Sequence, residues 1–192
     1  EGGIMKLEDM IATVTAGAQE KLEASSFVDE ADYQDIALKV GVAAIKFGDL
    51  INQRAKDYVF DLSKFFSFEG KTGPYLLYTI TRINSILKKA GVPADQPLLL
   101  TGVYTDSERE LLLKILMGGD VFQRTLAEKA PNYLCEDAYQ LANSFSKFYH
   151  DNRIIDEPDE AKKQSWLALI SLVRQVLCNH LDLLGIETVE HM

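Results

Sequence analysis

The chain has 192 residues with a formal net charge of −9, and 47% of its residues are hydrophobic. A chain of this length buries roughly 70% of the surface that its unfolded form exposes, so its core needs no disulfide or metal ion. No apolar run approaches the ~20 residues of a transmembrane helix, and no segment has the apolar centre of a signal peptide. The acidic balance argues against nucleic-acid binding that is broad and independent of sequence.

The reactive residue types predict neither a metal site nor a catalytic set. Cys135 and Cys178 belong to no CxxC pair, which favours reduced thiols in a cytoplasmic protein. The three histidines have no second imidazole or thiol at ligand spacing: His150, His180 and His191. The first residue is Glu1, and the initiator methionine is rarely removed before glutamate, so we expect the chain to be part of a longer protein.

Residues 1–69 predict a small unit of mixed α/β structure. A short strand is expected at 4–6 and a helix at 7–22, where apolar residues recur at helical spacing. A second helix is expected at 30–51. Its apolar side consists of Ile36, Val40, Ala43, Ala44, Phe47 and Leu50. Alternating side chains predict a further short strand at 56–62, which reads KDYVFDL.

Residues 70–192 predict an antiparallel bundle of four or five helices, so the expected fold is mainly α with a domain boundary near residue 70. Thr105 and Glu108 form a capping box, and Gly118–Gly119 are expected to interrupt the helix that follows it. Proline and glycine residues indicate where the other helices begin and end. The expected helices are 74–91, 105–117, 121–129, one that starts at Pro131, and 161–184, which Gly185 caps.

The helix expected at 74–91 has two distinct faces when its residues are placed at helical periodicity. One face is apolar and is expected to be buried; it consists of Leu76, Ile80, Ile83 and Leu87. Nearly opposite lie two tyrosines with polar and basic residues, which are expected outside the core: Tyr75, Tyr78, Arg82, Ser85 and Lys89.

The charge pattern singles out the same segment. Residues 1–35 hold nine acidic residues and two lysines, whereas residues 70–91 hold four basic residues and no acidic one. Such an aromatic and basic surface can stack unpaired bases while its cations meet phosphates. Tyrosines on the second face of a helix more often pack against a neighbouring domain, with the arginine in a salt bridge to it. The basic residues would also suit salt bridges to the acidic segment. A second basic-aromatic cluster surrounds Tyr149 and consists of Lys147, Tyr149, His150 and Arg153.

Residues 46–87 resemble a motif of the arginyl-tRNA synthetase family. They read KFGDLINQRAKDYVFDLSKFFSFEGKTGPYLLYTITRINSIL, and the family pattern is K-[YF]-x-D-L, then R-x-x-D-Y-x-F-D, then F-E-G-x-T-x-P-Y-x-x-Y-x-x-x-R-x-x-S-I. The end of the chain, LDLLGIETVEHM, resembles the family's usual ending G-I-x-x-x-x-R-M. The start, EGGIM, resembles the sequence that follows the family's ATP loop. The resemblance therefore covers essentially the whole chain.

The resemblance implies the C-terminal part of a class I aminoacyl-tRNA synthetase. Residues 1–69 would end the catalytic domain with its stem-contact region, and residues 70–192 would form the helical anticodon-binding domain. Arginine, ATP with Mg, and arginine tRNA are the substrates and cofactors that it implies for the full-length enzyme. The catalytic motifs would lie upstream, so this chain alone is expected to be inactive and to carry no catalytic or metal-binding residue. We expect a monomer.

The resemblance also assigns tRNA-binding positions. Tyr78 and Arg82 fall on the tyrosine and arginine that face the anticodon stem-loop in the family, and Tyr149 falls on a tyrosine near the splayed anticodon bases. The turn before the helix and the chain terminus complete the set. The expected tRNA-binding residues are Lys71, Thr72, Tyr75, Tyr78, Arg82, Tyr149 and Met192.

The chain departs from the family pattern at several positions, which bears on the individual base contacts rather than on the fold. His191 stands where the penultimate arginine is usual, and a histidine is mostly neutral at pH 7. The other departures are Gly48, Leu77, Thr79 and Arg153.

Two alternatives stay open: a helical module that holds a protein with the same face, and a synthetase of the same subclass such as the cysteinyl enzymes.

Overall fold

The structure is a computed structural model that describes residues 6–23, 33–58, 67–93 and 96–192. Within these ranges it contains six helices and no strand. The helices are α1 (Leu7–Glu23), α2 (Tyr33–Leu50), α4 (Gly73–Lys89), α5 (Asp106–Glu128), α6 (Asn132–Asp151) and α7 (Glu160–Leu183). The prediction of a mainly α fold is confirmed.

The two predicted strands fall largely outside the described residues. Residues 4–5 of the first and 59–62 of the second are not described, and residues 56–58 are irregular rather than extended in a ladder. The α/β character of residues 1–69, and the domain boundary after residue 69, therefore stay predictions.

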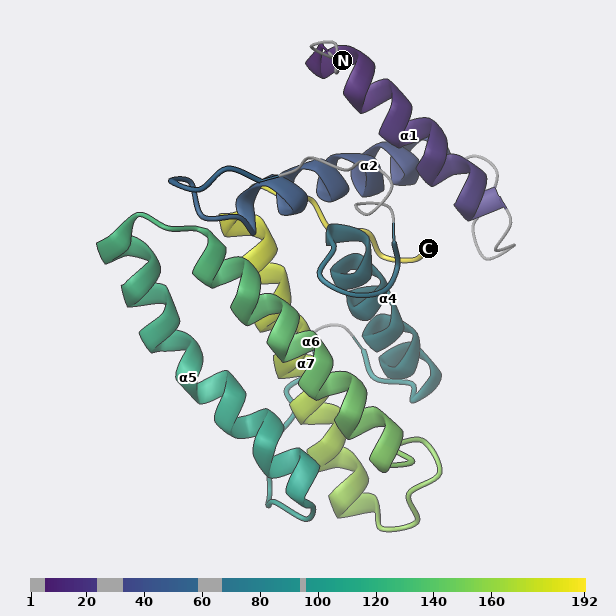
Figure 1. The fold of residues 1–192 in the computed structure, drawn as a ribbon. Coiled ribbons are helices and arrows are strands. Elements are labelled where there is room, and N and C mark those ends of the chain that lie inside the picture. Colours follow the sequence, from purple (N-terminus) through teal and green to yellow (C-terminus); the bar gives the residue numbers. More distant parts are fainter. Residues whose placement is uncertain (1–5, 24–32, 59–66, 94–95) are drawn as a thin grey trace.

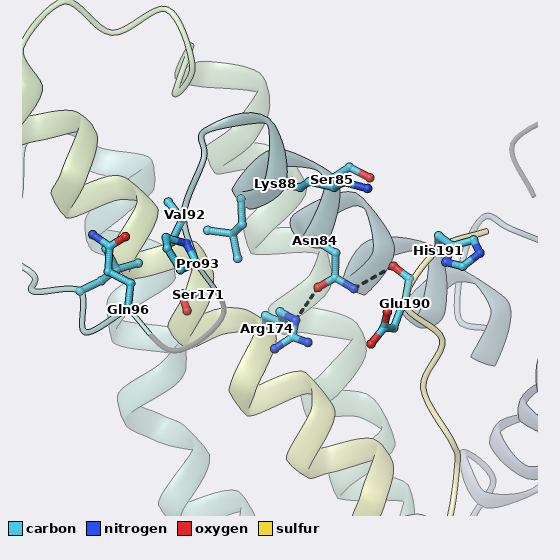
Figure 2. Close-up of a pocket in the computed structure, with 12 residues that line it drawn as sticks. Asn84, Ser85, Lys88, Val92, Pro93, Gln96, Ser171, Arg174, Glu190 and His191 are labelled. Carbon is cyan, nitrogen blue, oxygen red and sulfur yellow. Dashed lines mark hydrogen bonds between the residues drawn. The ribbon is translucent and has the colours of Figure 1, made fainter.

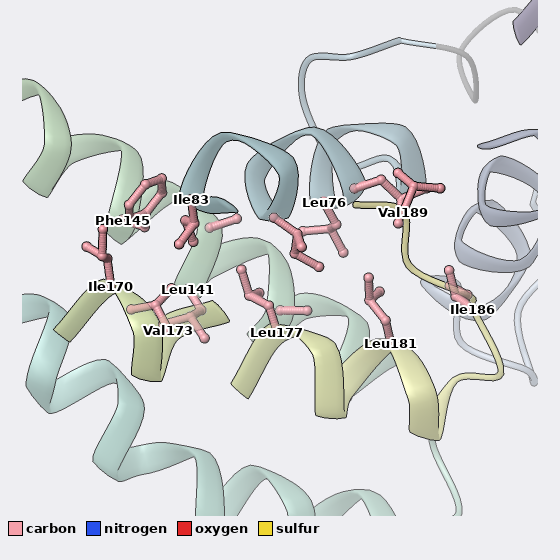
Figure 3. Close-up of a cluster of buried hydrophobic side chains, with 14 of the residues drawn as sticks. Leu76, Ile83, Leu141, Phe145, Ile170, Val173, Leu177, Leu181, Ile186 and Val189 are labelled. Carbon is pink, nitrogen blue, oxygen red and sulfur yellow. The ribbon is translucent and has the colours of Figure 1, made fainter. Parts of the chain in front are cut away.

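Helices α5, α6 and α7 follow one another as an antiparallel bundle, with α4 beside α6 and α7 (Figure 1). Helix α2 packs across the start of α4, and α1 packs on α2. The C-terminal tail leaves the end of α7 and returns toward α4, so the end of the chain lies near that helix (Figure 1). The core is built mainly by α4, α6 and α7 together with this tail (Figure 3).

The start of α4 is determined by three consecutive residues. Thr72 is the N-cap, and its hydroxyl oxygen accepts a hydrogen bond from the backbone N–H of Tyr75 at 3.2 Å. Pro74 lies in the first turn, where its missing N–H costs nothing. Between them, Gly73 lets α4 approach α2 closely, because a Cβ atom at this position would overlap the carbonyl oxygen of Ala43. The first turn of α4 is thus fixed against α2.

The predicted break at Gly118–Gly119 is wrong, because α5 runs without interruption from Asp106 to Glu128. A glycine inside a helix costs only about 1 kcal/mol relative to alanine. Packing of α5 against α6 outweighs that cost, and at Gly118 a Cβ atom would lie 3.8 Å from the carboxylate of Asp137 on α6. Thr105 caps this helix as predicted, because its hydroxyl accepts from the Glu108 N–H at 3.2 Å. The other half of the predicted capping box differs: the Glu108 carboxylate accepts from the N–H of Tyr104, one residue before the cap, at 2.8 Å.

Candidate nucleic-acid interface

Helix α4 buries its predicted apolar stripe and leaves a narrow outer face. Leu76, Ile80 and Ile83 are fully buried, as predicted, and Leu87 is half-buried. The buried side is wider than the stripe, because Leu77 and Ile86 are buried as well. The exposed residues of α4 are Tyr78, Ser85, Lys88 and Lys89.

Tyr78 presents its ring to solvent. Its exposed fraction is 41%, although the residues on either side of it, Leu77 and Thr79, are almost fully buried. Its hydroxyl has no hydrogen-bond partner among the described residues. The prediction that Tyr78 points outward is confirmed.

Arg82 and Tyr149 form a layered contact between α4 and α6. The guanidinium carbon of Arg82 lies 4.4 Å from the centre of the Tyr149 ring. That ring in turn stacks on Phe145, with 6.0 Å between ring centres and 27° between ring planes, and Phe145 is fully buried. A cation over an aromatic face is attracted by the ring but keeps its charge. Since Arg82 forms no ion pair within the described part of the chain, its charge is available to a ligand.

Tyr75 does not lie free on the outer face. Its hydroxyl donates to the amide oxygen of Asn143 at 3.0 Å and lies 3.2 Å from the Ser146 hydroxyl. Its ring meets Tyr139 edge to face at 5.9 Å. The expectation that Tyr75 lies outside the core is therefore corrected: this half-buried side chain packs between α4 and α6.

The turn before α4 also makes contacts within the protein, with α6 and with α4 itself. The Lys71 ammonium lies 2.7 Å from the Glu136 carboxylate and 5.4 Å from the centre of the Tyr139 ring. Burial alone would raise the pKa of Glu136, but hydrogen bonds from Lys71 and Gln140 outweigh it and hold that pKa below its ordinary value. Thr72 is buried, and its hydroxyl is used in capping α4.

The C-terminal tail is anchored by its backbone and by apolar side chains. Ile186 and Val189 are buried in the core that α4 and α7 share (Figure 3). The side-chain N–H of Asn84 donates to the carbonyl oxygen of Glu190 at 3.0 Å. Met192 is half-buried and packs against the core.

A cavity of about 380 Å³ opens between the C-terminal half of α4, helix α7 and the tail. Figure 2 shows Arg174 in its middle, donating from Nε to the side-chain oxygen of Asn84. The residues that line it are Asn84, Ser85, Leu87, Lys88, Val92, Pro93, Gln96, Leu98, Ser171, Arg174, Glu190 and His191. It is a mixed surface, with apolar and amide groups beside two cations and one carboxylate.

A largely buried ionic cluster connects α5, α6 and α7. Asp137 lies 2.6 Å from the Lys114 ammonium and 2.9 Å from Nε2 of His180. Burial alone would raise the pKa of Asp137, but hydrogen bonds from His180 and Lys114 outweigh it and hold that pKa below its ordinary value.

Among the residues that the structure describes, no three His, Cys, Asp or Glu side chains are grouped as metal ligands. No described helix combines the length and apolar character of a membrane crossing.

Comparison with known proteins assigns the family. The model of the DALR anticodon binding domain matches residues 76–192. The chain belongs to the DALR anticodon-binding domain family. An arginine–tRNA ligase of Alkaliphilus oremlandii is 46% identical over 193 residues, and one of Agathobacter rectalis is 36% identical over 205 residues. All of this chain is covered in both alignments, but only 33% and 34% of those relatives.

Solved structures agree with this assignment. The arginyl-tRNA synthetase of Thermus thermophilus superposes with a TM-score of 0.89 at 29% identity, over 100% of this chain and 33% of that one. The enzyme of Plasmodium falciparum superposes with a TM-score of 0.85, also at 29% identity, over 98% of this chain and 34% of that one. The chain thus spans about a third of the length of the relatives it matches, and the resemblance to arginyl-tRNA synthetases is confirmed.

Within the DALR domain, the structure brings Tyr78, Arg82 and Tyr149 to one surface. The hydroxyl groups of Thr72 and Tyr75, in contrast, form hydrogen bonds within the protein. Asn84 and Arg174 are additional polar residues that sequence reasoning did not single out, since they lie 90 positions apart on α4 and α7. Their only sequence signal was the basic character of the segment around Asn84.

Proposed function

We propose that this chain is the anticodon-binding part of an arginine–tRNA ligase and that it binds the anticodon stem-loop of arginine tRNA. The observation that carries the proposal is similarity along its whole length to relatives named arginine–tRNA ligase, at 46% identity in the relative from Alkaliphilus oremlandii. The geometry of α4 and α6 supports it, because an exposed aromatic ring lies one helical turn from an unpaired arginine.

The proposed contacts follow from the chemistry of single-stranded RNA. Unpaired bases stack on aromatic rings and on guanidinium planes, at about 1–3 kcal/mol per base. Tyr78 offers a free ring for one base, and the Arg82–Tyr149 pair offers a second planar surface whose charge also suits a phosphate. Met192 would close this surface from the tail.

We expect Lys71 to bind a phosphate less strongly than the resemblance implies. Its ammonium is already paired with Glu136 at 2.7 Å, and both side chains are about half exposed. An RNA phosphate would have to displace that carboxylate. We therefore propose Tyr78, Arg82 and Tyr149 as the principal contacts and Lys71 as an exchangeable one.

In the full-length enzyme, the chain would hold the anticodon end of the tRNA while the remaining domains attach arginine with ATP and Mg in the cytoplasm. The described residues include no group of side chains suited to a metal ion. We propose that the contacts with ATP and Mg belong to the other domains of the full-length enzyme.

A titration with RNA tests the proposal. The chain is titrated with the anticodon stem-loop of an arginine tRNA, and with one whose anticodon is changed, at several salt concentrations. We expect tighter binding of the arginine stem-loop, and log K should fall with log salt by about 0.7 per phosphate contact. Tyr78→Ala and Arg82→Ala should each weaken binding by about 1–3 kcal/mol.

The matched control is Tyr104→Ala, which removes a tyrosine of similar exposure (43% against 41%) near the start of α5. Its effect on RNA binding should be negligible. Equal affinity for both stem-loops, with no loss on changing Tyr78, would contradict the proposal and favour a protein partner for this face.

A further inference from the structure

The cavity between α4, α7 and the tail adjoins the proposed RNA surface but contains none of the residues assigned to it. Ser85 and Lys88 line the cavity and are also exposed on the outer side of α4. Lys88 follows Tyr78 by ten residues, which corresponds to about 15 Å along the helix axis. An RNA strand that leaves the ring of Tyr78 along α4 would therefore reach the mouth of this cavity within a few nucleotides.

Arg174 is held in the cavity by a neutral partner. Its Nε donates to the side-chain oxygen of Asn84, and the amide of Asn84 donates in turn to the carbonyl oxygen of Glu190 at 3.0 Å (Figure 2). These two bonds fix the orientation of the Asn84 amide, because guanidinium groups only donate and carbonyl groups only accept. The planar guanidinium is thus oriented while its two terminal nitrogens are left for another acceptor.

The positive charge of this cavity is only partly offset by the protein, because two cations and one carboxylate line it. In the described part of the chain, neither Arg174 nor Lys88 has a carboxylate within ion-pair distance. The Glu190 side chain lines the same cavity, yet it forms no ion pair there with a described residue. An arginine that an amide orients in this way is arranged to bind an anion such as a phosphate in a bidentate manner, and Lys88 adds positive charge at the rim of the same cavity.

We propose that this cavity is a second RNA subsite, which binds a backbone phosphate of the strand that passes Tyr78. Arg174 binds the phosphate, and Lys88 attracts it from the rim of the cavity. Asn84 is the positioning residue that orients Arg174 and holds the tail over the site. Glu190 opposes the phosphate electrostatically and so weakens binding. This inference rests on the proposed function, because it places a further contact of the same RNA.

Two charge changes with opposite expected effects test the subsite. Lys88→Gln should lower affinity for the arginine anticodon stem-loop several-fold at low salt and reduce the magnitude of the salt slope by about 0.7. Glu190→Gln should raise affinity, because it removes the opposing charge while its backbone carbonyl still accepts from Asn84. A merely structural role for these residues cannot produce an increase in one variant and a decrease in the other.

The controls are Lys6→Gln and Glu20→Gln, which make the same charge changes at exposed positions at or beside α1, remote from the cavity in the fold. Neither should change the affinity by more than a small fraction of the effects at Lys88 and Glu190.

Stem-loops that carry one neutral methylphosphonate in place of a phosphate identify the contact itself. At one position, the neutral linkage should weaken binding to the unaltered chain, and its effect should be smaller in Lys88→Gln, where only Arg174 still contacts that phosphate. If Lys88→Gln and Glu190→Gln both leave affinity and salt slope unchanged while Tyr78→Ala still weakens binding, the second subsite is refuted and the proposed function stands. If the unaltered chain binds no stem-loop, both are refuted.

Discussion

At the scale of single residues, the proposed RNA surface depends on arginines that the fold positions without an ion pair among the described residues. Arg82 lies on the ring of Tyr149, and that ring lies on the buried Phe145, so the cation is positioned by aromatic packing rather than by a carboxylate. Arg174 is positioned by the amide of Asn84 in the same sense. Neutral partners orient these groups and leave their charge for a ligand.

The role of the Tyr149 ring can be separated from that of its hydroxyl. Tyr149→Phe keeps the stack on Phe145 and the cation–π contact with Arg82, so RNA affinity should stay within about 0.5 kcal/mol of the original. Tyr149→Leu removes both contacts and leaves Arg82 unpositioned, so affinity should fall by about 1–2 kcal/mol. Both values come from stem-loop titrations, with thermal unfolding as the check on folding. A larger loss in Tyr149→Phe than in Tyr149→Leu would show that the hydroxyl, not the ring, carries the contact.

At the scale of elements, replacing either of two glycines with alanine should change the stability of the protein in opposite directions. Gly73 touches α2, and a Cβ atom there would overlap the Ala43 carbonyl, so Gly73→Ala should destabilise the protein by about 1–3 kcal/mol. Gly119 lies inside α5 with open space around it, so Gly119→Ala should stabilise the protein by up to about 1 kcal/mol. Urea unfolding measures both, and a loss of stability in Gly119→Ala would contradict the continuous α5.

The ionic cluster between α5, α6 and α7 makes a pH-dependent contribution to stability. Because the folded-state pKa of Asp137 is depressed, the contribution is present above the ordinary pKa of aspartate and is lost as pH falls through the lower folded value. Asp137→Asn leaves Lys114 without its carboxylate and should cost about 3 kcal/mol near neutral pH. Unfolding free energies of both proteins between neutral and acidic pH should converge at low pH. A difference that stays constant over this range would contradict the assignment.

Local patterns in the sequence predict most of the helices but not what each helix meets. The spacing of Leu76, Ile80 and Ile83 was enough to orient α4, and the outward position of Tyr78 followed from it. The same periodicity placed Tyr75 outside the core, because a helical wheel gives a direction and not the presence of α6 on that side. The break at Gly118–Gly119 was wrong because intrinsic propensity is small beside the packing of a long helix pair.

At the scale of the whole molecule, the C-terminal tail joins parts of the chain that are distant in sequence. The Gly185 carbonyl accepts from Lys46 on α2, and the Glu190 carbonyl accepts from Asn84 on α4. Ile186 and Val189 insert into the shared core between these anchors. The tail is therefore held between α2 and α4, and its last residue, Met192, is half-buried against the core. No local pattern predicts these long-range contacts, and the assignment of Met192 to the tRNA site stays a prediction from the family resemblance.

The central claim is that the outer face of α4 contacts anticodon nucleotides, and photo-crosslinking from position 78 tests it most directly. A photoreactive phenylalanine analogue replaces Tyr78, and the same analogue in place of Tyr104 serves as the control of matched exposure. The account predicts crosslinks from position 78 to unpaired nucleotides of the arginine anticodon loop, and none from position 104. Crosslinks from position 78 that fall only in the base-paired stem, or that occur equally from position 104, would contradict it.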